Sequence, residues 1–324
     1  MENMNHVKLG ATGLLVSRLA LGTAAFGLDR YGIPAPGNRS VERAEAMEML
    51  ACAADQGVNL FDTAPGYGTS EEILGSALAA RKECVFATKV AVPGDVEAIS
   101  NVELARKVNA SLDHSLRALR RDVLDIVQIH NATSSILARG EMIECLEKAR
   151  DQGKLRCIGA SVYGEEAALA ALRTRKIQVL QIAVSVLDQR MRRTVIPEAA
   201  AQGVGILSRS ALLKGVLTEK AQWLPGRLSQ LTEASRRALA AFDSTWKTLP
   251  SMALRFCVSL PGVDSVLSGI RNRAELEDCT TALARGPLEP ERLQKAFTLG
   301  LDDEGLLNPT HWKLEEIDTH LAQL

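Results

Sequence analysis

The chain has 324 residues, of which 46% are hydrophobic and 24% are charged, and its formal net charge is −1. This composition is typical of a soluble globular protein with a full hydrophobic core. Because positive and negative side chains nearly balance, the chain has no general electrostatic attraction to nucleic acid or to an anionic membrane, and neither partner is expected.

The amino terminus is polar and lacks the apolar core of a signal peptide, and no run reaches the roughly 18 apolar residues of a membrane span. A cytoplasmic location is the expectation by default. The cysteines form no C-x-x-C pair and no Cys/His spacing typical of a metal site, so we expect reduced, buried thiols and no metal. These cysteines are Cys52, Cys84, Cys145, Cys157, Cys257 and Cys279.

Short runs, mostly rich in Val, Ile and Leu, alternate with segments of helical periodicity along the whole chain. The runs that we expect to form strands are residues 19–23, 58–63, 85–90, 126–130, 157–162, 179–184, 205–210 and 265–270. Helical patterns occupy residues 41–56, 102–121 and 141–152, and the expected C-cap positions carry Gly57, Gly153 and Gly203. This alternation predicts an α/β fold, a closed parallel (β/α)8 TIM barrel, formed by a single domain over residues 1–324.

Further features lie outside the repeating pattern. Residues 7–18 carry the turn signal Gly10-Ala11-Thr12-Gly13, which indicates a β-hairpin before the barrel. The irregular stretches 214–230 and 300–324 can reach the barrel mouth. The competing architecture is a doubly wound open sheet, which usually carries G-x-G-x-x-G after its first strand. Residues 22–27 read GTAAFG at that point and do not match, which favours the barrel.

Reactive side chains fall at the carboxyl ends of the expected strands, where the active sites of such barrels lie. Asp62 ends the second strand, and Tyr67 lies in the loop after it. Lys89 lies near the end of the third strand, and His130 ends the fourth. A tyrosine beside a lysine can donate a proton near neutral pH, because the ammonium is expected to lower the tyrosine pKa from about 10. A carboxylate can hold the lysine and a histidine can orient a carbonyl oxygen, so the set predicts carbonyl reduction.

Each of these residues taken alone has an ordinary explanation. Lys89 fits a strand edge, and His130 fits a core histidine with satisfied hydrogen bonds. A buried aspartate and lysine in a barrel interior are costly unless they are paired, so the joint placement favours catalysis. A metal-dependent lyase or hydrolase would need a cluster of carboxylates and histidines, for which only Asp62 and His130 qualify.

The chain resembles the aldo-keto reductases over essentially its whole length. The resemblance depends on the hairpin-like start and on the runs FDTAPGYG (61–68), SEEILG (70–75), TK (88–89), DIVQIH (125–130) and GKLRCIGAS (153–161). It implies that Tyr67 is the general acid or base, that Lys89 and Asp62 tune it, and that His130 orients the substrate carbonyl. Residues 186–190, Arg209 with the next serine, and the late run from 308 to 312 look most like bacterial members associated with sugar and surface-polysaccharide metabolism.

The resemblance also implies an extended nicotinamide cofactor bound without a Rossmann fold. At its nicotinamide end, Ser161 and Gln181 match the positions that bind the carboxamide. Gly22 and Thr23 end the first strand beneath the ribose, and Asp62 is also among the residues implied to bind the cofactor.

The phosphate end of the cofactor matches two later segments. Residues 209–215 (RSALLKG) correspond to the segment that wraps the pyrophosphate, with the contacts implied for Arg209, Ser210, Leu212 and Lys214. Arg209 stands where an aromatic often stacks on nicotinamide, and its planar guanidinium can stack instead. Gly269, Arg271 and Glu275 fall on the adenosine-phosphate positions.

The chain departs from the family pattern at a few positions. Val162 replaces a common Asn, Val184 replaces an aromatic, and Cys279 replaces an Asn that often contacts adenine. Glu275 stands in place of Gln or Arg and would repel the 2′-phosphate of NADP, whereas Arg271 would attract it. The Arg271 match favours NADP(H), Glu275 weakens this preference, and NAD(H) is the alternative.

Two functions remain open at this point. The first is nicotinamide-dependent carbonyl reduction or alcohol oxidation on a small-molecule substrate. The second is a cofactor-binding regulatory subunit with little catalytic turnover, a role that some relatives have; the intact set of four site residues favours the enzyme. Loop aromatics could either line the substrate site or anchor their loops. They are Phe26, Tyr31, Trp223 and Trp312.

Overall fold

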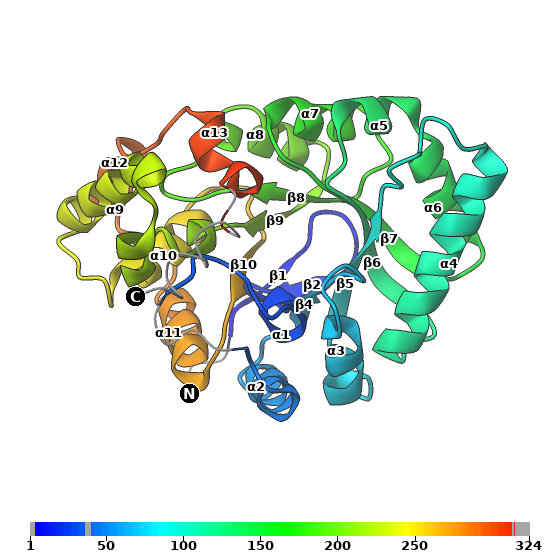
Figure 1. Ribbon diagram of the computed structural model, residues 1–324, viewed down its shortest axis with the longest axis horizontal. Coiled ribbons are helices and arrows are strands. Elements are labelled where there is room, and N and C mark those ends of the chain that lie inside the picture. Colours follow the sequence, from blue (N-terminus) through cyan, green and yellow to red (C-terminus); the bar gives the residue numbers. More distant parts are fainter. Residues whose placement is uncertain (1–3, 36–39, 313, 315–324) are drawn as a thin grey trace.

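A computed structural model describes residues 4–35, 40–312 and 314. Parallel strands close into a barrel in the order β10-β3-β4-β5-β6-β7-β8-β9, and helices surround it (Figure 1). The barrel strands are β3 (Leu19–Gly22), β4 (Leu60–Asp62), β5 (Val85–Ala91), β6 (Leu124–His130), β7 (Leu155–Ser161), β8 (Val179–Ala183), β9 (Gly205–Arg209) and β10 (Ser265–Gly269). The predicted (β/α)8 barrel is confirmed, and each expected strand is present with its ends shifted by two residues at most.

The helices that follow the strands are α2 (Arg43–Asp55), α3 (Ser70–Leu78), α4 (Asn101–Leu119), α6 (Glu141–Asp151), α7 (Glu165–Arg173), α8 (Val195–Ala201), α10 (Leu249–Val258) and α11 (Arg273–Ala284). Further helices are α1 (Ala24–Gly27), α5 (Ser134–Arg139), α9 (Ser229–Phe242), α12 (Pro290–Phe297) and α13 (Glu304–Leu307). The helices expected over 41–56, 102–121 and 141–152 are confirmed as α2, α4 and α6.

The predicted hairpin is also present, as strands β1 (His6–Lys8) and β2 (Leu15–Ser17). Leu9, Leu14 and Val16 of this hairpin are buried against inward-facing side chains of the barrel strands. Those side chains are Ala20, Leu60, Val85, Ala87, Ile126, Cys157, Val179 and Leu207. The hairpin therefore closes the amino-terminal end of the barrel and leaves the carboxyl end as its mouth.

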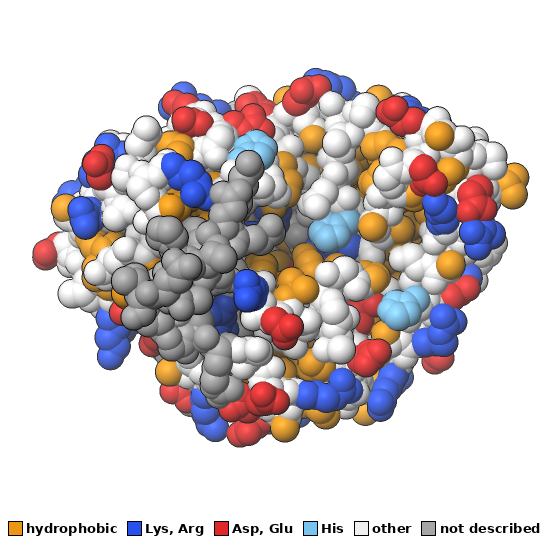
Figure 2. Space-filling model, viewed as in Figure 1, with side chains coloured by type: hydrophobic (Ala, Val, Ile, Leu, Met, Phe, Trp, Pro, Cys, Tyr) orange, Lys and Arg blue, Asp and Glu red, His pale blue; other side chains and the backbone are white. Residues whose placement is uncertain are grey.

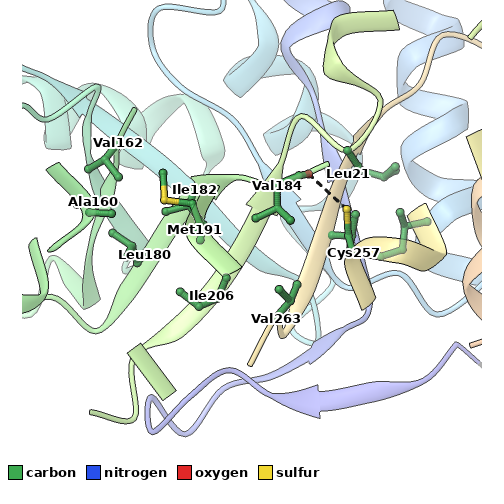
Figure 3. Packing of buried hydrophobic residues seen from close by; sticks show 14 of the residues in the cluster. Leu21, Ala160, Val162, Leu180, Ile182, Val184, Met191, Ile206, Cys257 and Val263 are labelled. Carbon is green, nitrogen blue, oxygen red and sulfur yellow. Dashed lines mark hydrogen bonds between the residues drawn. The ribbon is translucent and has the colours of Figure 1, made fainter. Parts of the chain in front are cut away.

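A second and larger core lies between the barrel and its helices. Figure 3 shows part of it, where alternate residues of β7, β8 and β9 pack against side chains from the loops and helices outside. The Cys257 thiol donates a hydrogen bond to the Val184 carbonyl oxygen at 3.3 Å, as the dashed line marks (Figure 3). Val162 also belongs to this outer core, where its side chain is fully buried among apolar residues.

The inward positions of the strands change from apolar to polar toward the mouth. The register pairs Lys89 with Gln128 on β5 and β6, and Ser161 with Gln181 on β7 and β8. Because side chains alternate along a strand, these residues lie above the apolar layer and on the same inner face. Figure 2 shows a hollow near the centre of one face of the molecule, beside a histidine side chain. Within the described ranges, no helix is long and apolar enough to cross a bilayer.

Candidate active site

The centre of the site is a buried ion pair between β4 and β5. Lys89 Nζ donates to Asp62 Oδ1 at 2.6 Å and to the Thr63 carbonyl oxygen at 2.9 Å. The two charged side chains are only 1% and 3% exposed. Such a pair is costly to bury, and replacing it by apolar residues is often neutral or stabilising, so a stability role alone explains it poorly.

Two glutamines hold the other oxygen of the Asp62 carboxylate. Gln181 Nε2 donates to Oδ2 at 2.7 Å, and Gln128 Nε2 donates to the same atom at 3.1 Å. Ser161 in turn donates to Gln181 Oε1 at 3.2 Å. Gln128 has no part in the site predicted from the sequence, although its spacing of two residues from His130 on one strand places both on the inner face.

Tyr67 and His130 lie above this ion pair at the mouth. Their ring centres are 5.8 Å apart and the rings are nearly perpendicular, and Lys89 Nζ lies 5.0 Å from the centre of the Tyr67 ring. Among the residues that the structure describes, the Tyr67 hydroxyl has no hydrogen-bond partner. The structure thus brings together Asp62, Tyr67, Lys89 and His130, and it leaves the tyrosine hydroxyl free for a ligand.

The expected lowering of the Tyr67 pKa is wrong for the protein as it stands. Burial raises the pKa of Tyr67 well above its ordinary value, and the Asp62 carboxylate raises it further, while the Arg209 guanidinium opposes the rise. The Lys89 ammonium is paired with Asp62, so much of its effect on the tyrosine is cancelled. Tyr67 therefore keeps its proton at neutral pH, which suits a proton donor.

His130 is predicted to be neutral through the physiological range. Burial lowers the pKa of His130 to about 4, helped by the Lys89 and Arg209 charges and opposed by Asp62. Between pH 6.5 and 4 the unfolded chain therefore binds a proton that the folded protein does not, so the free energy of unfolding should fall as pH falls through this window. The slope contributed by this one group is at most about 1.4 kcal/mol per pH unit.

Urea unfolding of the natural protein and of His130→Gln at pH 7 and pH 5 measures this contribution. The loss of stability between the two pH values should be smaller in the variant. Equal losses in both proteins would show that the pKa of His130 is not depressed in the folded state.

Close backbone contacts fix the loop that carries Tyr67. A Cβ atom added to Gly27 would lie 1.9 Å from the Tyr67 carbonyl oxygen and 2.6 Å from the Ser70 nitrogen. A Cβ atom added to Gly68, whose φ is +58°, would lie 2.1 Å from the Gly27 carbonyl oxygen. The Ser70 hydroxyl lies 3.0 Å from Thr63 Oγ1 and donates to the Thr23 carbonyl oxygen at 3.1 Å. Packing of α1 against this loop therefore sets the height of Tyr67.

We predict that Gly27→Ala lowers kcat/KM by at least about tenfold, because a misplacement of about 1 Å at a catalytic group can cost a hundredfold. Gly66→Ala is the matched control in the same loop, since its added Cβ would meet no atom within 4 Å. Steady-state kinetics of both variants measures the difference. Equal activity of the two variants would mean that α1 does not position the tyrosine.

The residues expected at the nicotinamide end lie at adjacent strand ends. Gly22 and Gly269 are neighbours in the register of β3 and β10, where neither carries a side chain. The Thr23 hydroxyl already has a hydrogen-bond partner within the protein, since its Oγ1 donates to the Asp62 carbonyl oxygen at 3.0 Å. The side chain of Thr23 thus stabilises the ends of β3 and β4, and the bare glycines leave open surface beside it.

Residues 210–215 form an irregular turn after β9. Ser210, Leu213 and Lys214 have positive φ angles of 62°, 44° and 52°, and Gly215 has 111°. Such angles are uncommon outside glycine, and neighbouring left-handed residues can turn backbone N–H groups toward a common centre that binds anions. This turn remains the candidate for the phosphate-binding segment.

Basic side chains gather between this turn and the loop after β10. Lys214 Nζ lies 5.5 Å from the centre of the Tyr31 ring, and Arg271 Nη2 donates to the Tyr31 carbonyl oxygen. Arg271 Nη1 is buried without a hydrogen-bond partner among the described residues. Lys220 is a further member that the sequence did not reveal; burial lowers the pKa of Lys220, and the Arg271 charge lowers it further. Glu275 Oε2 accepts a hydrogen bond from the Arg271 backbone N–H at 2.7 Å, so the carboxylate lies against its own loop.

Arg209 does not point freely into the mouth. Its guanidinium carbon lies 3.8 Å from the centre of the Tyr163 ring, and Nη2 donates to the Val162 carbonyl oxygen at 2.8 Å. Tyr163 had no expected role. Stacking of Arg209 on the nicotinamide stays a prediction.

The loop aromatics divide into two kinds. Phe26 and Trp312 are buried, at 4% and 1% exposure, and the Trp312 ring nitrogen donates to the Leu306 carbonyl oxygen at 2.9 Å. These two anchor their loops. Tyr31 and Trp223 are 37% and 43% exposed and remain candidates for substrate contact. Of the tail expected at the mouth, residues 313 and 315–324 lie outside the described residues.

Comparison with known proteins agrees with this geometry. Residues 18–296 match the model of the Aldo/keto reductase family. L-galactose dehydrogenase of Arabidopsis thaliana is 29% identical over 312 residues, which cover 92% of this chain and 91% of that protein. The NADH-specific methylglyoxal reductase of Escherichia coli is 27% identical over 311 residues, which cover 86% of this chain and 94% of that protein.

A solved structure shares the fold. Aldo-keto reductase AKR11C1 from Bacillus halodurans superimposes with a TM-score of 0.76 at 23% identity, over 96% of this chain and 100% of that one. The family match spans the barrel strands and the site residues described above. The chain therefore belongs to the aldo/keto reductase family and is an NAD(P)-dependent oxidoreductase that acts on carbonyl or alcohol groups.

Proposed function

We propose that the protein reduces an aldehyde or ketone to an alcohol, or catalyses the reverse oxidation, with Tyr67 as the general acid or base. The observation that carries this proposal is the buried Lys89–Asp62 ion pair, which lies against Tyr67 and His130 at the barrel mouth. The family membership gives the type of reaction, and this cluster gives the residues that would perform it.

The nicotinamide end of the cofactor fits the residues present. A Cβ atom added to Gly22 would lie 3.6 Å from its nearest neighbour, and one added to Gly269 would lie 3.9 Å from its own. The two strand ends, which carry no side chains, therefore leave room for a ligand. Gly22 and Thr23 would lie beneath the ribose. Ser161 and Gln181 would hold the carboxamide beside Asp62. When bound, the nicotinamide supplies the hydride to the carbonyl carbon.

The phosphate end fits as well. The turn over residues 210–215, which includes Ser210, Leu212 and Lys214, would surround the pyrophosphate with backbone N–H groups. Gly269, Arg271 and Glu275 would lie at the adenosine phosphate, with the unpartnered Nη1 of Arg271 as a donor.

The protein's own side chains would handle the proton. Tyr67 carries its proton at neutral pH and would donate it to the carbonyl oxygen as the alcohol forms. His130, which is neutral, would donate a hydrogen bond to the same oxygen and orient it. Lys89, fixed by Asp62 and Thr63, would stabilise the phenolate that remains on Tyr67 until the tyrosine is protonated again.

We propose that NADP(H) binds more tightly than NAD(H), by about tenfold, or roughly 1.4 kcal/mol. A bidentate contact between Arg271 and the 2′-phosphate is a strong charge-assisted interaction, and the Glu275 carboxylate opposes it through repulsion. Arg271→Ala should shrink the preference, and Glu275→Gln should widen it. The measurement is the dissociation constant of each cofactor for the natural protein and both variants.

Arg273→Ala is the control for charge alone. Arg273 lies two residues from Arg271, but its guanidinium pairs with Glu277 at 3.1 Å, so its removal should leave the preference unchanged. The NADH-specific relative shows that the opposite preference occurs among similar proteins. If NAD(H) binds equally or more tightly and Arg271→Ala has no effect on the preference, the loop after β10 does not bind the 2′-phosphate.

The substrate is proposed to be a sugar or a sugar-like carbonyl compound. L-galactose dehydrogenase and D-threo-aldose 1-dehydrogenase are similar to this chain over 92% and 76% of its length. The exposed rings of Tyr31 and Trp223 are of the kind that stack on sugar faces.

A direct assay separates the proposed enzyme from a regulatory subunit that only binds cofactor. Fluorescence titration measures NADPH binding, and the loss of NADPH absorbance with simple aldehydes and aldoses measures turnover. We expect both binding and turnover. Tight cofactor binding without turnover on any carbonyl compound would favour the regulatory role.

A further inference from the structure

Arg209 is held in one orientation across the mouth of the barrel. It ends β9 beside Ala183 of β8, and its side chain extends to the loop after β7. There the guanidinium stacks on the Tyr163 ring and donates to the Val162 carbonyl oxygen at 2.8 Å. An arginine fixed by a stacking contact and a hydrogen bond loses little further freedom when it binds a ligand.

The charge of Arg209 is not neutralised by the protein. In the part of the chain that the structure describes, Arg209 forms no ion pair, and its buried Nε has no hydrogen-bond acceptor. The Asp62 carboxylate already accepts hydrogen bonds from Lys89, Gln128 and Gln181. A partly buried cation without a counter-charge is unfavourable unless a ligand supplies one.

The position of Arg209 at the barrel mouth distinguishes it from other stacked arginines. Arg192 makes a similar contact, 4.1 Å from the centre of the Phe297 ring, and also has an unpartnered Nε, so stacking alone is not a sign of a ligand site. Arg209 differs because its charge acts directly on the reacting groups. It opposes the rise in the pKa of Tyr67 and adds to the fall in the pKa of His130.

We propose that Arg209 binds an anionic group of the substrate, a carboxylate or a phosphate, while Tyr67 and His130 hold its carbonyl oxygen. The inference rests on the proposed function and deepens it, because it narrows the substrate to aldehydes or ketones that carry such a group. Guanidinium N–H groups match the oxygens of carboxylate and phosphate, and these charge-assisted hydrogen bonds are stronger than neutral ones. Acidic or phosphorylated sugar-like compounds meet both requirements.

Matched pairs of compounds test this preference and distinguish the two anions. The carboxylate pair is 4-oxobutanoate and its methyl ester, and the phosphate pair is glyceraldehyde 3-phosphate and glyceraldehyde. Calorimetry with NADP⁺, which cannot reduce them, gives dissociation constants without any need for turnover. Steady-state kinetics with NADPH gives the ratio of kcat/KM within each pair. We expect at least one anion to be preferred over its neutral partner by tenfold or more.

Arg209→Met should reduce that ratio at least tenfold, and Arg209→Lys should restore part of it. Arg192→Met is the matched control and should leave the ratio unchanged. NADP⁺ affinity of Arg209→Met is measured alongside. If Arg209→Met binds NADP⁺ more weakly but keeps the same ratio between charged and neutral compounds, Arg209 belongs to the cofactor site and the proposal is overturned. The absence of a preference for either anion in the natural protein would also overturn it. Absence of turnover with a binding ratio that still depends on Arg209 would contradict the proposed reduction and leave the anion site standing.

Discussion

Tyr67→Phe is expected to lower kcat/KM for carbonyl reduction by at least two orders of magnitude while NADPH binding survives. The reason is that general acid catalysis contributes about 10²–10⁴ to rate, and the Tyr67 hydroxyl, beside His130 and the Lys89–Asp62 pair, is the proposed proton donor. Steady-state kinetics and fluorescence titration of NADPH measure the two quantities separately.

Tyr163→Phe is the matched control for this variant. It also removes one phenolic hydroxyl at the mouth, but it keeps the ring on which Arg209 stacks. The control should keep kcat/KM within about fivefold of the natural value, well short of the effect of losing general acid catalysis. Near-normal turnover by Tyr67→Phe would end its assignment as the proton donor.

Lys89→Met is expected to damage both activity and stability. It leaves the Asp62 carboxylate buried without its cationic partner, and breaking a buried pair typically costs about 3–5 kcal/mol. The hydrogen bonds from Gln128 and Gln181 remain, so the lower end of that range is expected. Urea unfolding measures the stability, and kcat/KM should fall by about 10²-fold or more, comparably to the effect of Tyr67→Phe.

The double variant Asp62→Asn with Lys89→Met separates the two effects. Removing both charges should restore a large part of the lost stability, because no unpaired carboxylate stays buried. Activity should remain low, because Tyr67, the proposed proton donor, lacks its cationic neighbour. Full activity in Lys89→Met would show that the lysine only fills the barrel interior.

The barrel, and the convergence of Asp62, Lys89 and His130 at its mouth, could be predicted from the sequence because both depend on local patterns. Strand–helix alternation gives the closed parallel barrel, and the carboxyl ends of parallel strands meet at one mouth. Asp62, Lys89 and His130 are near strand ends, so their convergence follows from the topology alone. The hairpin signal at Gly10 and Gly13 works in the same way, since a tight turn is encoded by neighbouring residues.

Contacts between distant segments could not be predicted in this way. Gly27 and Tyr67 are separated by a strand and a helix, and only the folded chain shows that their backbones touch. Tyr163 lies in a loop and Lys220 in a short 3-10 helix, Glu219–Trp223, both without sequence periodicity, so no pattern placed them near Arg209 and Arg271. The pKa of Tyr67 depends on burial and on several nearby charges. From the sequence, only the effect of the Lys89 ammonium on Tyr67 could be considered.

The central claim is that the carbonyl is reduced by hydride transfer at this site, with the proton supplied by Tyr67. A single-turnover experiment with NADPH deuterated at the transferred position, for the natural protein and Tyr67→Phe, tests it most directly. The account predicts an alcohol that carries one deuterium on carbon, formed at least about a hundredfold more slowly by the variant with its cofactor bound. An alcohol without deuterium on carbon, or equal rates in the two proteins, would contradict it.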